Sequence, residues 1–174
     1  PSWLANLGGT LVFSANDGTN GTELWKSNGT AAGTLLVLDI NPGAGSSNPA
    51  YLTVVGATLF FRATEPANGT ELWKSNGTGA GTVLVKDINP GAAANSSPAF
   101  LLNAGGLLLF TASDGTNGTE LWRSNGTAIG TVLVKDIAPG AGGSNPYGLA
   151  TVGSAVVLAA NDGTNGYELW KTDG

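Results

Sequence analysis

The sequence predicts an all-β fold, an antiparallel β-propeller-type repeat array built from four-stranded units of about 48 residues. Three observations predict it. One sequence motif recurs four times, each unit divides into short runs rich in β-branched and aromatic residues, and some of these runs are apolar on both faces. We treat residues 1–174 as one repeat domain. Its repeats are 1–48, 49–97, 98–145 and 146–174, the last of them incomplete. The alternative folds are a β-solenoid or another linear repeat array.

Two independent markers give the same repeat period. The tryptophan of the motif "ELW" recurs at spacings of 48, 49 and 48 residues, and the proline that opens each unit has the same spacings. These markers are Trp25, Trp73, Trp122 and Trp170, and Pro1, Pro49, Pro98 and Pro146. A fixed period of this length is typical of solenoids, propellers and arrays.

The second repeat shows the four expected strands in order. They are 49–55 (PAYLTVV), 57–63 (ATLFFRA), 70–75 (TELWKS) and 81–88 (GTVLVKDI). Each run is rich in β-branched or aromatic residues and is bounded by Gly, Asn, Pro or Asp, which is the pattern of strands joined by turns. No stretch has the periodicity of a long helix.

The second and third strands favour a propeller over a solenoid. Successive side chains of a strand point to opposite faces, yet the neighbours Phe60 and Phe61 are both apolar, as are Leu24 and Trp25. A strand that is apolar on both faces belongs to a sheet packed between two others. Four-stranded sheets packed in this way are propeller blades, whereas solenoids usually have shorter repeats.

Composition excludes several classes of function. The formal charge is −5 and the seven basic residues are scattered, which argues against nucleic acid as a partner. No apolar run approaches the roughly 20 residues of a membrane-spanning helix. Cysteine and histidine are absent, so disulfides, Cys/His zinc sites and Ser-His catalysis are excluded, and no phosphate-binding loop occurs. The sequence therefore predicts a protein that is not an enzyme and has no cofactor, with calcium as the one candidate.

The acidic residues repeat as the units do. All but Asp173 belong to three repeated classes, so no carboxylate has the distinct environment that acid–base catalysis needs. An acid, an asparagine and the glutamate of "ELW" nevertheless offer oxygens to Ca²⁺, which prefers six to eight of them. The candidate calcium ligands are Asp17, Asn20, Glu23, Asp114, Asn117, Glu120, Asp162, Asn165 and Glu168. The alternative role of Asp and Asn here is to hold turns through bonds to the backbone.

The stretch "ANDGTNGTELWKSNGTAAGTLLVLDINPGAG" resembles the ELWxxDGT repeat proteins of bacteria, which are large secreted or surface-exposed chains. The resemblance covers the whole chain, since "ELW", "GTxxGT" and "KDINPG" recur in order. It implies an extracellular or cell-surface location and further repeats of the same kind. The chain departs from the family where Asn28, Asn76 and Asn125 replace the aspartate before Gly-Thr.

Asparagine–glycine pairs mark the turn after "ELW" and also create glycosylation sequons. Asn-Gly between two strands is a strong hairpin signal. The same residues, with Ser or Thr two places later, are acceptors for N-glycans in organisms that have the machinery. The possible glycosylation sites are Asn20, Asn28, Asn68, Asn76, Asn95, Asn117 and Asn125.

Two sets of aromatic residues recur. The tryptophans of "ELW" are expected to pack between units, because an exposed tryptophan in every unit would favour aggregation. The second set lies close behind each opening proline and varies in size, as ligand-contacting residues do. Its members, the candidate sugar-binding residues, are Trp3, Tyr51, Phe100 and Tyr147.

Together these features predict a non-enzymatic structural or adhesive interaction module of an extracellular repeat protein. Its expected partners are copies of itself, further repeats of the same chain, glycans or surface proteins. The fourth repeat lacks its last strand, so we expect either that the chain continues or that a neighbouring chain donates a strand. The alternative function is a carbohydrate-binding lectin with one shallow site per blade.

Overall fold

The computed structural model describes residues 1–91 and 93–174, and every regular element in them is a β-strand. The all-β prediction is therefore confirmed. No helix in these residues is long and apolar enough to cross a membrane.

Fifteen strands form four antiparallel sheets, each made from strands that are consecutive in the chain. The first sheet contains β1 (Ser2–Leu7), β2 (Thr10–Asn16), β3 (Thr22–Ser27) and β4 (Leu35–Leu38). The second contains β5 (Ala50–Val55), β6 (Thr58–Glu65), β7 (Gly69–Ser75) and β8 (Val83–Lys86). The third contains β9 (Ala99–Ala104), β10 (Leu107–Ser113), β11 (Thr119–Ser124) and β12 (Val132–Lys135). The fourth contains β13 (Tyr147–Val152), β14 (Ala155–Asn161) and β15 (Tyr167–Thr172).

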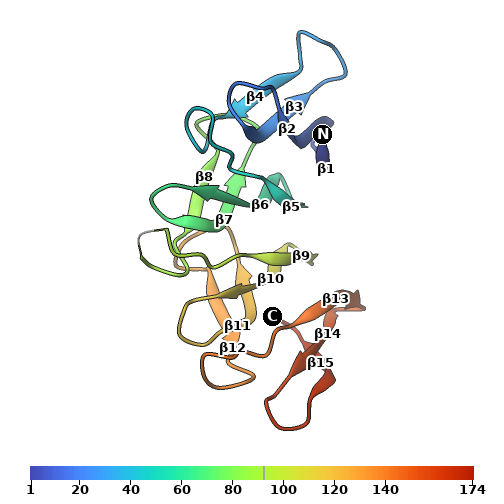
Figure 1. Ribbon diagram of the computed structural model, residues 1–174. Coiled ribbons are helices and arrows are strands. Elements are labelled where there is room, and N and C mark those ends of the chain that lie inside the picture. The colour runs from blue at the N-terminus through green and yellow to red at the C-terminus, as the bar shows by residue number, and fades with distance from the viewer. Residues whose placement is uncertain (92) are drawn as a thin grey trace.

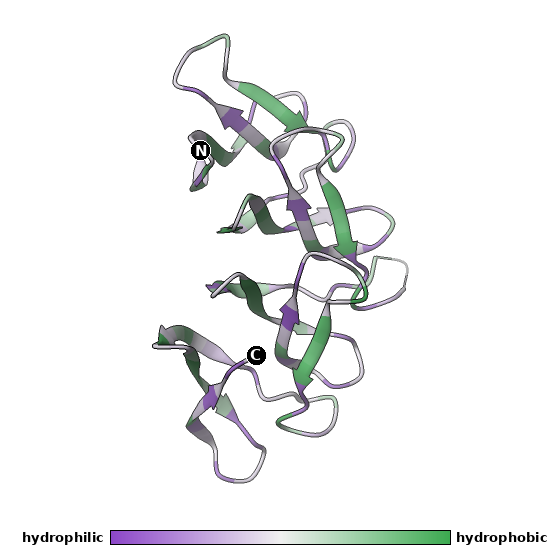
Figure 2. Cartoon of the chain, turned by 180° about the vertical axis from the view of Figure 1, so that it is seen from behind, coloured by the Kyte–Doolittle hydropathy of each residue, from purple (hydrophilic) through white to green (hydrophobic). Residues whose placement is uncertain are grey.

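The four sheets stack one after another in chain order (Figure 1). The first strand of each sheet, β1, β5, β9 or β13, lies on the same side of the stack and contacts the first strand of the next sheet. Figure 2 shows the hydrophobic residues concentrated on the strands, whereas the connecting loops are mostly hydrophilic. The first strands therefore lie along one side of the stack, and the short fourth strands β4, β8 and β12 form the opposite edges of their sheets.

Three hydrophobic cores lie between successive sheets. In the core of the first two sheets, Leu24 packs with Phe61 and Trp73. Phe60, the neighbour of Phe61, belongs to the next core, where it packs with Phe110 of the third sheet. The expectation that the second strand is buried on both faces is confirmed for these residues, because the second sheet is packed on both sides. The tryptophans of "ELW" at Trp73 and Trp122 are buried as expected.

Each first strand contains an irregularity in its pairing with the second strand. In the second sheet, Ala50 pairs with Arg62 and Thr53 pairs with Phe60, so the register shifts between them. The other three sheets have the same shift at the same place. Such a bulge redirects side chains of the strand that carries it, and in three sheets the redirected residue is aromatic.

Candidate functional site

The glutamate of "ELW" is completely buried in the first three repeats. The carboxylate of Glu71 accepts hydrogen bonds from the backbone N–H of Ile88 (2.9 Å), the N–H of Ser96 (2.8 Å) and the Ser96 hydroxyl. The equivalent sets are Glu23 with Ile40 and Ser47, and Glu120 with Ile137 and Ser144. Each glutamate therefore fastens the loop that leads into the next sheet.

The environment of this carboxylate differs in the fourth sheet. Burial raises the pKa of Glu23 and Glu71, and the hydrogen bonds from the serine and isoleucine offset part of that effect. Glu168, at the same position on β15, is exposed, and among the described residues β15 pairs with β14 alone. One position of the repeat thus occurs in both a buried and an exposed form.

The acid before "NG" belongs to a separate turn. Asp17 accepts hydrogen bonds from the N–H groups of Thr19 (2.9 Å) and Asn20 (2.8 Å) and from the Asn20 side-chain amide (2.7 Å). These donors lower the pKa of Asp17. The Asp114–Asn117 and Asp162–Asn165 pairs have the same bonds. Aspartate and asparagine therefore hold a turn here, the alternative that the sequence left open.

The structure divides the residues proposed to bind calcium. Asp17 and Asn20 bond with each other, whereas the oxygens of Glu23 bond with Ile40 and Ser47. Among the described residues, no group of three or more Asp, Glu, His or Cys side chains is arranged to hold a metal ion. Calcium at this turn stays a prediction, and any ion there would have to displace these hydrogen-bond donors.

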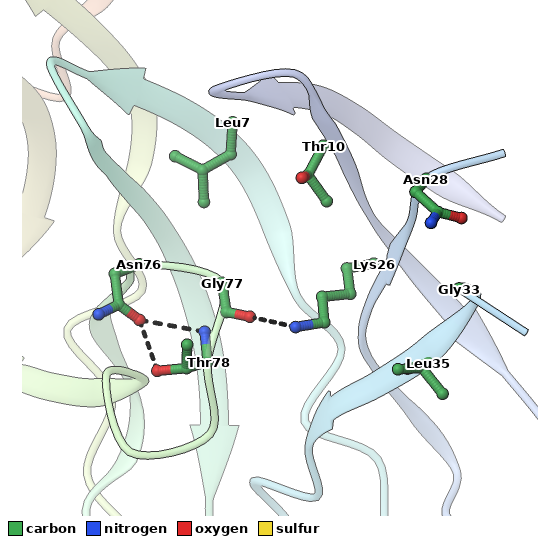
Figure 3. Close-up of a pocket in the computed structure, with 9 residues that line it drawn as sticks. All are labelled: Leu7, Thr10, Lys26, Asn28, Gly33, Leu35, Asn76, Gly77 and Thr78. Atoms are coloured by element: carbon green, nitrogen blue, oxygen red, sulfur yellow. Dashed lines mark hydrogen bonds between the residues drawn. The ribbon is translucent and has the colours of Figure 1, made fainter.

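The turn after "ELW" is held from within and from the preceding sheet. The Asn76 side-chain oxygen accepts bonds from the Thr78 N–H (3.0 Å) and hydroxyl (2.7 Å). The Lys26 ammonium of the first sheet donates to the carbonyl of Gly77 (2.8 Å), as Figure 3 shows at the edge of a cavity between the two sheets. Lys74 makes the same bond to Gly126 in the third sheet (2.7 Å). This lysine therefore clamps neighbouring sheets together.

The asparagines of the glycosylation sequons fall into two groups. Four are exposed: Asn28, Asn76, Asn95 and Asn125. Three are half-buried and donate their amide N–H to the acid three residues earlier in the same turn: Asn20, Asn68 and Asn117. Because a glycan is attached to that amide nitrogen, the exposed group is the better placed for modification.

Three of the four candidate sugar-binding residues form a continuous aromatic row along the first strands. The ring centroids of Trp3 and Tyr51 are 4.8 Å apart, and those of Tyr51 and Phe100 are 6.4 Å apart. Trp3 and Phe100 are each 45% exposed, which is unusual for such large apolar side chains. We call Trp3, Tyr51 and Phe100 the aromatic row.

The backbone of the aromatic row lies in the left-handed region. The φ angles of Trp3, Tyr51 and Phe100 are 53°, 58° and 51°. Bulky residues rarely adopt this conformation, which costs on the order of 1–3 kcal/mol and is found most often at functional sites. Gly148 occupies the same position of the fourth repeat with φ of 65°. The position thus accepts glycine, yet three repeats place an aromatic ring there, exposed at Trp3 and Phe100 and half-buried at Tyr51.

Tyr147, the fourth candidate, lies outside the row. Its ring packs edge-on against Tyr167 of β15, with centroids 5.5 Å apart. The bulge position itself is held by Gly148, so no ring extends the row into the fourth sheet.

Arg62 adds a charge to the aromatic row. Its guanidinium carbon lies 5.1 Å from the ring centroid of Tyr51. It also lines a hollow of about 190 Å³ between the first two sheets, together with Trp3. The remaining lining residues are Ser2, Ser14, Thr22, Asn48, Pro49 and Ala50, none of which is charged. The hollow can therefore offer one cation, one aromatic wall and several neutral polar groups.

Sequence reasoning did not single out Arg62 or the serines bonded to the buried glutamates. Two signals point to them. A serine stands two residues before the opening proline at Ser47, Ser96 and Ser144. Arg62 is charged, whereas its counterparts are Ser14, Thr111 and Ala159.

Comparisons with known proteins add no family to this picture. No protein-family model matches the chain, and no curated protein matches it either. The resemblance to ELWxxDGT repeat proteins therefore stays a prediction that rests on the repeated sequence motifs alone.

Proposed function

We propose that the chain is a non-enzymatic structural or adhesive interaction module of an extracellular or cell-surface repeat protein. Two roles of its residues support this. The repeated carboxylates serve the fold: Glu23, Glu71 and Glu120 fasten loops, and Asp17 holds a turn. The aromatic row has no such role in the fold: its backbone is strained and its Trp3 and Phe100 side chains are exposed, which is the observation that carries the proposal.

The sheets are propeller-type blades in this proposal. Their four-stranded antiparallel order and their packing on both faces support it. A linear array of the same sheets is the alternative. Small-angle X-ray scattering on the protein distinguishes them, because an extended stack gives a larger radius of gyration than a curved, ring-forming one.

Substituting the aromatic row by glycine tests its role in adhesion. Since Gly148 already occupies the fourth position, Tyr51→Gly and Phe100→Gly are compatible with the backbone and relieve its strained φ angles. We expect the double variant to fold and to lose adhesion to glycan- or protein-coated surfaces. Leu11→Ala, at an exposed position of β2, is the control. If the double variant adheres as well as the unsubstituted protein, the row is not the contact surface.

Carbohydrate binding is the second candidate function, and the exposed side chains of Trp3 and Phe100 favour it. Aromatic residues combine a large apolar face with low conformational entropy, which suits the flat faces of sugar rings. A glycan array read with and without calcium tests this candidate. Binding that Tyr51→Gly reduces supports it, and silence across the array removes it.

We also propose that copies of the protein assemble with one another through the edges of their sheets. Among the described residues, β15 pairs only with β14, whereas β3, β7 and β11 pair with strands on both sides. Leu169 on β15 is 79% exposed and Tyr167 is 50% exposed. Unpaired, apolar edges recruit strands from other chains. We expect light scattering to show concentration-dependent assembly that Leu169→Lys suppresses, and a strictly monomeric protein would count against this proposal.

A further inference from the structure

We propose that the hollow between the first two sheets binds one carboxylate-bearing ring of an acidic saccharide, with Arg62 holding the carboxylate and Trp3 carrying the ring. This inference rests on the carbohydrate-binding candidate function and names its ligand class. It adds a charged recognition group to a row that is otherwise neutral.

A cation–π contact positions the Arg62 guanidinium beside the hollow. Its carbon lies over the ring of Tyr51, 5.1 Å from the centroid, and Arg62 also lines the hollow. The N–H donors of a guanidinium lie in its plane and form a fork that matches the two oxygens of a carboxylate. Arg62 is therefore held in place by Tyr51 while its donor edge can bind an anion.

The remaining lining of the hollow suits sugar hydroxyls. Ser14, Thr22 and Asn48 contribute polar groups without charge, and no acid lines the hollow. A bound anion thus meets no carboxylate within the site, although the whole chain has a charge of −5. The more distant charges are screened beyond about 8–10 Å at physiological salt. Attraction at short range by Arg62 therefore decides whether an acidic ligand binds.

The size of the hollow limits the ligand to part of a chain. Its volume of about 190 Å³ lies below the roughly 300–1,000 Å³ of pockets that enclose whole small molecules. One sugar ring fits such a space, and the neighbouring rings of a saccharide can extend along the aromatic row. An acidic peptide offers carboxylates too, but its side chain presents no flat ring to Trp3.

The second repeat alone has this arrangement. Arg62 pairs in register with Ala50, next to Tyr51, and the counterparts of Arg62 are the uncharged Ser14, Thr111 and Ala159. The structure therefore leads us to expect one acidic-sugar site in the chain, not one for each repeat.

Titration calorimetry of the 174-residue chain with a galacturonic acid trimer, a neutral galactose trimer and hexaglutamate tests the inference. We expect one site for the acidic trimer, with binding that weakens as salt is raised. Arg62→Gln should weaken it by about 10-fold to 100-fold, the range of a lost charged hydrogen bond. Arg62→Lys keeps the charge without the fork and should give an intermediate loss. Arg123→Gln, at an exposed site on β11 outside the hollow, is the matched control and should leave the affinity for the acidic trimer unchanged.

The outcomes distinguish the acidic-sugar inference from carbohydrate binding, the candidate function on which it rests. If both trimers bind equally and Arg62→Gln has no effect, the acidic-sugar inference is wrong while carbohydrate binding stands. If neither trimer binds, the inference is wrong, and the glycan array decides the candidate function independently. Tighter binding of hexaglutamate than of the acidic trimer overturns the inference in favour of a peptide ligand. Thermal unfolding of each variant shows that a loss of binding is not a loss of fold.

Discussion

Replacing Glu71 by alanine should destabilise the protein far more than the same change at Glu168. Both residues are the glutamate of "ELW", but Glu71 is completely buried and Glu168 is exposed. The pair therefore compares one residue type at one repeat position in two environments.

The magnitude follows from the hydrogen bonds that Glu71 accepts. Its removal leaves the N–H of Ile88 without an acceptor. The N–H and the hydroxyl of Ser96 also lose a bond to Glu71, but both still donate to the carbonyl of Thr70. A buried unsatisfied donor costs about 1–3 kcal/mol, and the cost of burying the carboxylate is recovered. We expect a loss of about 2 kcal/mol for Glu71→Ala and about half of that for Glu71→Gln.

Urea unfolding followed by tryptophan fluorescence measures the difference. Glu168→Ala is the control and should lie within about 0.5 kcal/mol of the unsubstituted protein, as exposed substitutions usually do. Midpoints are compared only between variants with equal slopes, since a change of slope signals altered cooperativity. Equal losses for the alanine variants of Glu71 and Glu168 would refute the role assigned to the buried carboxylate.

Four further outcomes are expected. Because burial raises the pKa of Glu71, the contribution of Glu71 to stability should increase as the pH falls towards 4.5, the usual pKa of a glutamate. Unfolding measured across this pH range should show a smaller increase for Glu71→Gln. The lowered pKa of Asp17 acts in the opposite sense, so stability should be lost as pH falls below about 3.8, and less so in Asp17→Asn. Gly81→Ala should cost about 1 kcal/mol, because its Cβ would collide with the side-chain oxygen of Asn76; Asn76→Ala should then cost little more in that background, by urea unfolding. Calcium should raise the melting temperature little, because both oxygens of Asp17 already accept hydrogen bonds, and a rise of several degrees in scanning calorimetry would support a calcium site.

Local chemistry explains why the strands could be predicted from sequence. Runs such as 81–88 are rich in β-branched residues and end at Gly, Asn and Pro, so their propensities and turn signals agree. The neighbours Phe60 and Phe61 indicated burial on both faces, which the cores on either side of the second sheet confirm.

The site was predicted in part, because much of it depends on distant contacts. The sequence places Tyr51 and Phe100 after an opening proline, but it does not show the bulge that aligns them in the row and excludes Tyr147. The partners of Glu23 lie 17 and 24 residues further along the chain, so the sequence alone allows its oxygens to be read as metal ligands. The contact of Arg62 with the ring of Tyr51 likewise depends on the folded sheet.

Contacts between first strands join each sheet to the next, and clamps such as Lys26 with Gly77 act at the same junctions. A force applied to the two ends of the protein must therefore pass through every junction in series. We expect the sheets to give way one at a time, each releasing about 48 residues, or roughly 160 Å of extended chain. A chain built from many such units would therefore lengthen under tension in steps of this size, sheet by sheet.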